Sequence, residues 1–144
     1  MIQTVAVGTD GSDTAAKAVD FALDLASKYG AKLVVGSSYR PVSEGKVRRD
    51  QREAPEDIQW SINPTQEVDA TLRAVEAKAK AAGVPTVTEA REGEPAEVLC
   101  GIAEEHGADV LVVGNKGMHR KVLGSVPNNI SHNAPCSVLI VKTV

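Results

Sequence analysis

The residues best suited to chemistry lie in one glycine-rich segment near the end of the chain. Gly114 and Gly117 bracket a short loop that follows an apolar run, and Gly124 and Ser125 stand where a later helix would begin. Glycine lets the backbone approach an anion that a Cβ would keep away, and N–H groups at the start of a helix bind phosphate. Arg120 adds a positive charge between the two ends. The segment therefore predicts a phosphate-binding loop.

A second polar turn follows the first apolar run of the chain, residues 4–8. It contains Thr9 and Asp10, followed by Gly11 and Ser12. An aspartate in such a turn either accepts hydrogen bonds from a ligand or caps the helix that follows. The residue types leave both roles open for Asp10.

Hydrophobic periodicity divides the chain into alternating strands and helices, with helices that stop near Gly30, Gly83 and Gly107. The predicted strands cover residues 4–8, 32–39, 86–91, 109–114 and 137–142, and the predicted helices cover about 13–29, 68–79, 95–106 and 125–133. This alternation predicts one α/β domain over residues 1–144, a doubly wound five-stranded parallel sheet with helices on both faces. Residues 40–64 show no clear periodicity and are expected to form a long connection.

The two polar turns are expected to meet. In a doubly wound sheet the first and fourth strands are neighbours at the point where the strand order reverses, and ligands bind beyond their carboxyl ends. Those strands are the two that run into glycine loops, at Thr9–Asp10 and at Gly114–Gly117. Two lines of reasoning therefore predict a single binding crevice.

Composition excludes several classes of function. The net charge is −3, and one Trp, one Phe and two Tyr leave few platforms for stacking bases, so nucleic-acid binding is not expected. No apolar run is long enough to cross a membrane, and no signal segment is recognisable at Met1, so we expect a cytoplasmic protein. Cys100 and Cys136 lack metal-ligand spacing and are expected to be reduced, largely buried thiols.

Four segments together resemble the universal stress protein family, in its single-domain branch that binds adenine nucleotides. They are Asp10-Gly11-Ser12, Val112-Val113-Gly114-Asn115-Lys116-Gly117, Gly124-Ser125-Val126 and the closing Ala134-Pro135-Cys136-Ser137-Val138-Leu139-Ile140-Val141. The resemblance covers essentially the whole chain and implies a Rossmann-like fold of the adenine nucleotide alpha hydrolase type. It also implies a role in stress response and a bound ATP or other adenine nucleotide. Mg²⁺ would accompany a triphosphate and be held mostly by phosphate and water.

The resemblance also implies a role for each matching residue. Asp10 would accept hydrogen bonds from the ribose or adenine side, and Val113 would pack on the base. Thr9 and Ser37 would line the adenine pocket, Ser37 mainly through its backbone. The phosphate oxygens would be held by Gly114, Gly117, Gly124 and Ser125, by the backbone N–H of Val126, and by the charge of Arg120. Ser125 is also expected to cap the helix that follows it.

The spacer between Gly117 and Gly124 departs from the family pattern. It holds only the residues from Met118 to Leu123, three fewer than the nine of the family motif. The loop on the phosphate side must then be tighter, which bears on a triphosphate more than on adenosine. Three alternatives follow: a dimeric interaction module that does not bind ATP, a binder of AMP or cyclic AMP, and a slow ATP hydrolase. No pair of residues in the sequence identifies a catalytic nucleophile with its base.

The last strand predicts self-association. Its residues Val138 to Val141 are apolar on both faces, yet the strand is expected at an edge of the sheet. A bare apolar edge invites pairing with another strand. We therefore predict a homodimer formed through the C-terminal residues, from Val138 to Val144, across a two-fold axis.

Overall fold

The computed structural model describes residues 1–39, 65–115 and 123–143. The predicted connection over residues 40–64 lies outside these ranges, as do Gly117, Arg120 and Val144. The described strands form one five-stranded sheet in the order β3-β2-β1-β4-β5, in which every neighbouring pair is parallel. These strands are β1 (Thr4–Gly8), β2 (Lys32–Tyr39), β3 (Thr86–Glu92), β4 (Val110–Gly114) and β5 (Ser137–Val141).

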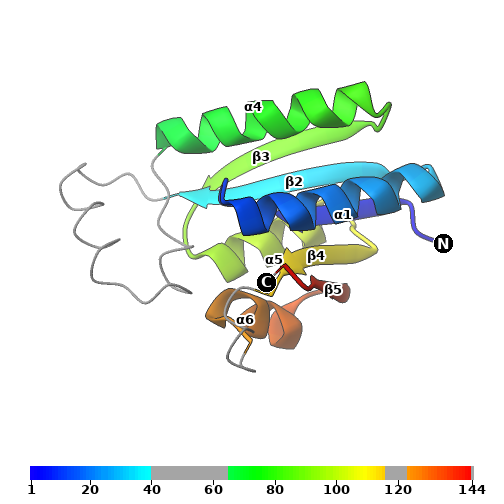
Figure 1. The fold of residues 1–144 in the computed structure, drawn as a ribbon. Coiled ribbons are helices and arrows are strands. Elements are labelled where there is room, and N and C mark those ends of the chain that lie inside the picture. The colour runs from blue at the N-terminus through cyan, green and yellow to red at the C-terminus, as the bar shows by residue number, and fades with distance from the viewer. Residues whose placement is uncertain (40–64, 116–122, 144) are drawn as a thin grey trace.

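Helices cover both faces of the sheet, as Figure 1 shows. On one face lie α1 (Asp13–Tyr29) and α4 (Thr65–Ala81), and on the other lie α5 (Pro95–Glu105) and α6 (Ser125–Asn133). The predicted fold class is therefore confirmed, including the pairing of β1 with β4 at the point where the strand order reverses.

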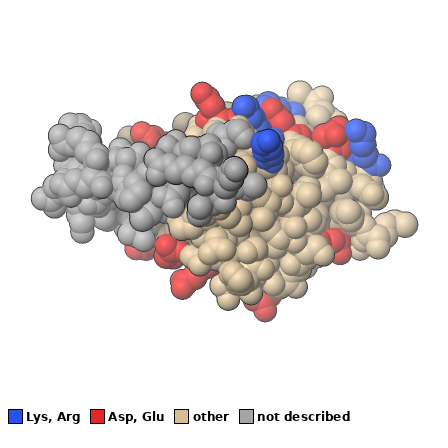
Figure 2. Space-filling model, turned by 60° about the horizontal axis from the view of Figure 1, so that its bottom comes forward, with Lys and Arg blue, Asp and Glu red and all other residues tan. Residues whose placement is uncertain are grey.

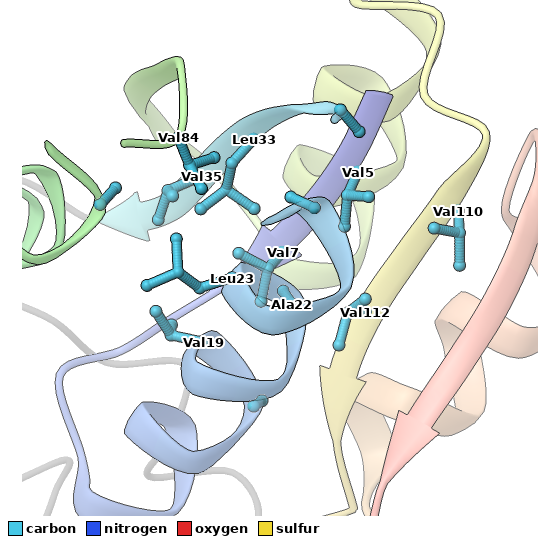
Figure 3. Close-up of a cluster of buried hydrophobic side chains, with 14 of the residues drawn as sticks. Val5, Val7, Val19, Ala22, Leu23, Leu33, Val35, Val84, Val110 and Val112 are labelled. Carbon is cyan, nitrogen blue, oxygen red and sulfur yellow. The ribbon is translucent and has the colours of Figure 1, made fainter. Parts of the chain in front are cut away.

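The central strands are apolar throughout because each side chain has a helical layer to face. In β1, Val5 and Val7 belong to the cluster under α1 and α4, whereas Ala6 belongs to the cluster on the α5 and α6 side. Figure 3 shows Val5 and Val7 packed with side chains of α1 and of the neighbouring strands. Burial on both faces explains why β1, β2 and β4 read as continuous apolar runs rather than as alternating ones.

Helix α1 begins and ends where its sequence predicts. The Ser12 side chain accepts a hydrogen bond from the Ala15 amide, and Gly30 ends the helix in the left-handed conformation with φ 63°. Ser12 is therefore the N-cap, and Asp10 takes another role. The cap places the loop after β1 at the start of α1, at the carboxyl edge of the sheet.

The two edge strands differ in character. β3 carries polar residues, as expected for an edge, whereas Val138, Leu139 and Ile140 of β5 are apolar and only half-buried. Cys100 and Cys136 are free thiols that pack against the hydrophobic cluster on the α5 and α6 side, and their burial raises the pKa of each. In the described ranges, no helix has the length and apolar character to span a membrane.

Candidate functional site

The loop after β1 is held by its own side chains. The Gly11 amide donates to Thr9 Oγ1 at 3.2 Å, and the Ser12 amide donates to Asp10 Oδ1 at 2.9 Å. Gly11 takes φ 83°, a conformation that side chains other than glycine's rarely adopt. Asp10 thus shapes the turn with one carboxylate oxygen, at the carboxyl edge of the sheet.

The end of β2 is tied to the same loop. The Thr9 amide donates to the Gly36 carbonyl at 3.0 Å, and Ser37 Oγ donates to the Thr9 carbonyl at 2.7 Å. Thr9 and Ser37 are both buried, with 3% and 1% of their surface exposed. The Ser37 hydroxyl therefore positions the β1 loop, which brings Thr9, Asp10 and Ser37 into one neighbourhood.

Glycines at the ends of β1 and β2 let α5 approach closely. A Cβ on Gly8 would overlap Leu99, and a Cβ on Gly36 would lie 2.7 Å from Ile102 Cδ1 and 3.1 Å from Leu99 Cδ2. Real Cβ atoms do not come so near, so the Leu99 and Ile102 side chains, or α5 itself, would have to move if either glycine carried a side chain. The two glycines thereby allow the side chains of α5 to lie close to the sheet.

The ends of these strands and the start of α5 enclose a narrow pocket that is too small to admit a water molecule. Its walls are Thr9, Asp10, Gly36, Ser37, Ser38, Pro95 and Leu99. Sequence reasoning found Thr9, Asp10 and Ser37 but missed Pro95 and Leu99. The sequence did contain a sign of a sharp turn between β3 and α5. Only Gly93, at φ 141°, and one further residue separate β3 from Pro95, the first residue of α5. This arrangement turns the start of α5 toward the crevice.

The end of β4 lies beside the end of β1. Gly114 closes the strand, and Val113 is buried in the cluster between the sheet and the α5 and α6 layer. Because Val7 pairs with Val112, the next residues, Gly8 and Val113, lie side by side where the strands end. Asn115 follows with only 1% of its surface exposed, and its Oδ1 accepts hydrogen bonds from the Thr143 amide and hydroxyl.

The start of α6 corrects one expectation. Ser125 is not the N-cap but the first helical residue, and Gly124 occupies the cap position with φ −59° and ψ 160°. The reason is that the Gly124 carbonyl already accepts the first helical hydrogen bond, from the Asn128 amide at 3.0 Å. Gly124 has no side chain that could accept from the first N–H groups of the helix. Ser125 and Val126 each provide one of these backbone N–H groups, whereas Pro127 has no N–H group.

A second and wider pocket lies on the other face of the sheet, between α1 and α4. It has a volume of about 370 Å³ and is lined mainly by small apolar residues, with Thr9 and Gly11 at its border. Asp10 and Ser37 are absent from its walls, whereas both line the pocket beside α5. Asp10 and Ser37 therefore lie on the α5 side, whereas Thr9 borders both pockets. In the described ranges no three His, Cys, Asp or Glu side chains are grouped as metal ligands.

A model of the universal stress protein family matches residues 1–142. The chain belongs to this family. A universal stress protein of Mycobacterium tuberculosis is 40% identical over 145 residues, which cover 98% of this chain and 97% of the relative. The universal stress protein YxiE of Bacillus subtilis is 32% identical over 148 residues, covering 99% of this chain and all of that relative.

Solved structures of universal stress proteins share the fold. One, a complex with cyclic AMP, matches with a TM-score of 0.75 and 35% identity and covers 99% of both chains. Another, a universal stress protein family member from Arabidopsis thaliana with AMP bound, matches with a TM-score of 0.73 over 99% of this chain and 92% of that one. At 19% identity, this second likeness concerns the fold alone.

Proposed function

We propose that this universal stress protein binds an adenine nucleotide in the crevice between the loop after β1 and the end of β4. The observation that carries the proposal is the gathering of polar groups from distant segments at one carboxyl edge. Thr9, Asp10 and Ser37 line the pocket beside α5, Gly114 ends the neighbouring β4, and α6 begins without a side-chain cap. A similar protein of 35% identity was solved with cyclic AMP, which supports an adenine nucleotide.

The two halves of the site suit the two halves of a nucleotide. The adenine would enter between Ser37 and Leu99, where α5 and the strand ends must move apart to admit it, and the ribose hydroxyls would donate to the Asp10 carboxylate. The phosphate would lie at the first turn of α6, where uncapped N–H groups and the helix dipole favour an anion. Sequence reasoning adds Gly117 and Arg120 to the phosphate side as predictions.

ATP is the first candidate, and AMP or cyclic AMP is the second. The family motif favours ATP, whereas the three-residue shortening between Gly117 and Gly124 and the cyclic AMP complex of a similar protein favour a monophosphate. With ATP, Mg²⁺ would be held by phosphate oxygens and water. We propose a regulatory role in the cytoplasm under stress, in which occupancy of the site is the signal.

Calorimetric titration of the purified protein with ATP and Mg²⁺, AMP, cyclic AMP and GTP tests the proposal. We expect at least one adenine nucleotide to bind well below 1 mM, a free energy of roughly 4 kcal/mol or more, and GTP to bind more weakly. Asp10→Asn keeps an acceptor for the Ser12 amide but loses the charge, so it should weaken binding about tenfold or more while the fold remains stable. Asp10→Ala should weaken binding and also lower the melting temperature.

The outcomes separate the candidates. Binding of none of the nucleotides below roughly 1 mM would contradict the proposal and favour an interaction module. Tight binding of cyclic AMP or AMP with weak binding of ATP would favour the second candidate. Production of ADP by the wild-type protein, reduced in the Asp10→Ala variant, would assign slow ATP hydrolysis to the same site.

We further propose that the functional unit is a homodimer joined through β5. On the side where α6 and β5 lie, Figure 2 shows a broad surface of uncharged residues with charged side chains mainly near its rim. Val138, Leu139 and Ile140 contribute half-buried apolar side chains to the β5 edge. A second copy of the strand would cover that edge.

A further inference from the structure

Asn115 stands at the point where β4 enters the proposed nucleotide crevice. It directly follows Gly114, and its residue surface is 1% exposed. Its Oδ1 accepts two hydrogen bonds from Thr143, from the backbone amide at 2.7 Å and from the hydroxyl at 2.9 Å. Because a backbone amide can only donate, the atom that faces it must be the oxygen. The orientation of the Asn115 amide is therefore fixed by its surroundings.

The other arm of the same amide lacks an acceptor. Among the buried side-chain nitrogen and oxygen atoms of the described residues, Asn115 Nδ2 is the one without a hydrogen-bond partner. Burial of a donor without an acceptor is unfavourable, and such groups are rare in native proteins. A residue held this firmly by its oxygen, with its N–H₂ group unsatisfied, indicates an acceptor that comes from a ligand.

The surroundings of Asn115 determine which way its unsatisfied N–H₂ group faces. Thr143 follows β5, which flanks β4 on one side, and the end of β1 flanks it on the other. The two arms of a planar amide diverge, so Nδ2 is turned away from Thr143 when Oδ1 faces it. Thr143 is itself buried, and its carbonyl accepts from Lys17 Nζ at 3.2 Å, so it provides a fixed support. The free arm therefore faces away from Thr143, and Asn115 itself directly follows the strand that ends beside β1.

We propose that Asn115 Nδ2 donates a hydrogen bond to a phosphate oxygen of the bound nucleotide, so that Asn115 distinguishes a nucleotide from a nucleoside. This assignment rests on the proposed nucleotide site. A phosphate oxygen is an anionic acceptor, and hydrogen bonds to charged groups are the strong ones. The phosphate that AMP, cyclic AMP and ATP share next to the ribose is the acceptor common to all three candidates.

Two substitutions remove the donor in different ways. Asn115→Asp keeps the oxygen that Thr143 requires but removes the N–H₂ group, and Asn115→Leu removes both arms without adding charge. Thr143→Val is the matched control, because it removes one contact to Oδ1 and leaves both Nδ2 and the Thr143 amide in place. Each variant is titrated with AMP and with adenosine, and its melting temperature is recorded.

We expect Asn115→Asp and Asn115→Leu to bind AMP about ten- to a hundredfold more weakly than the wild type. Their affinity for adenosine should change less than about threefold, and Thr143→Val should retain the wild-type ratio of AMP to adenosine affinity. The ratio of AMP to adenosine affinity is the decisive readout. If Asn115 had only a structural role, all three variants would melt at a lower temperature, but this ratio would not change.

Failure of this assignment is distinguishable from failure of the nucleotide site. If the wild type binds AMP and both Asn115 variants keep its affinity ratio, Asn115 does not contact the phosphate, while the proposed function stands. If the ratio falls equally in Thr143→Val, the loss comes from distortion of the β4 end and the assignment is overturned. If the wild type binds neither AMP nor adenosine, the proposed function fails and the assignment fails with it.

Discussion

Among single residues, Asp109 shows how one carboxylate can join two strands. It precedes β4, and its Oδ2 accepts hydrogen bonds from the Gln3 amide at 2.7 Å and the Thr4 amide at 3.0 Å, at the start of β1. The Gln3 and Thr4 N–H groups stabilise the charged form and lower the pKa of Asp109. Strands β1 and β4, which flank the proposed site, are thus fastened at the edge opposite to it.

The lowered pKa predicts how stability depends on pH. A carboxyl whose pKa is lower in the folded protein contributes stability above its ordinary pKa and loses it as the pH falls through the lowered value. Asp109→Asn should therefore have a lower melting temperature than the wild type at pH 7, and the difference should shrink as the pH falls below about 4. Melting curves by circular dichroism between pH 2 and 8 measure both.

Asp24→Asn is the control for the Asp109 experiment. Asp24 is an exposed residue of α1 that pairs with Lys28 at 3.0 Å, and exposed pairs of this kind contribute little. Its melting temperature should stay close to that of the wild type throughout the pH range. An Asp109→Asn variant that behaves like Asp24→Asn would show that the two backbone hydrogen bonds do not stabilise the carboxylate.

At the scale of elements, the position of α5 depends on the glycine of β2. Gly36→Ala would place a Cβ 2.7 Å from Ile102 Cδ1, so α5 or its side chains must move. We expect a loss of about 1–3 kcal/mol in the free energy of unfolding, as for other overpacked cores. Because α5 also carries Pro95 and Leu99 of the pocket, nucleotide affinity should fall too. Chemical denaturation and calorimetry measure the two effects.

The matched control is the same substitution within α5. A Cβ on Gly101 would meet only Arg91 Nη1, at an ordinary 3.4 Å, and alanine favours a helix interior more than glycine does. Gly101→Ala should therefore stabilise the protein by about 0.5–1 kcal/mol. If Gly36→Ala were equally well tolerated, the close approach of α5 to the sheet would not limit the size of residue 36.

At the scale of the whole molecule, the β5 edge predicts a dimer that a charge can disrupt. We expect the wild type to have twice the mass of one chain in light scattering coupled to size exclusion. Leu139→Lys places a charge on the half-buried edge strand and should shift the protein to monomer, because a charge at an interface core loses hydration. Ser137→Lys, at an exposed position of the same strand, should remain dimeric.

A monomeric wild type at tens of micromolar would contradict the dimer. Because unfolding of Leu139→Lys would also abolish association, its circular dichroism spectrum and melting curve must show a folded protein. A folded Leu139→Lys variant that stays dimeric would place the contact elsewhere than on β5.

The order and type of the elements could be predicted from the sequence because they depend on local patterns. Apolar runs such as residues 4–8 and 110–114 are buried on both faces, and glycines such as Gly30 end helices through their own backbone preference. From that order, the general rules of parallel sheets place β1 beside β4. Thr9, Asp10 and Gly114 could thus be predicted to follow neighbouring strands at one edge of the sheet without any contact being known.

The tertiary structure alone decided which groups meet within that crevice. Leu99 reaches the ends of β1 and β2, and Thr143 fixes Asn115, through contacts between segments far apart in the chain. Gly124 rather than Ser125 caps α6, because a cap depends on where the first helical hydrogen bond forms and not only on residue type. Local hydrophobic periodicity does not predict such contacts, because they form only when segments far apart in the chain pack together.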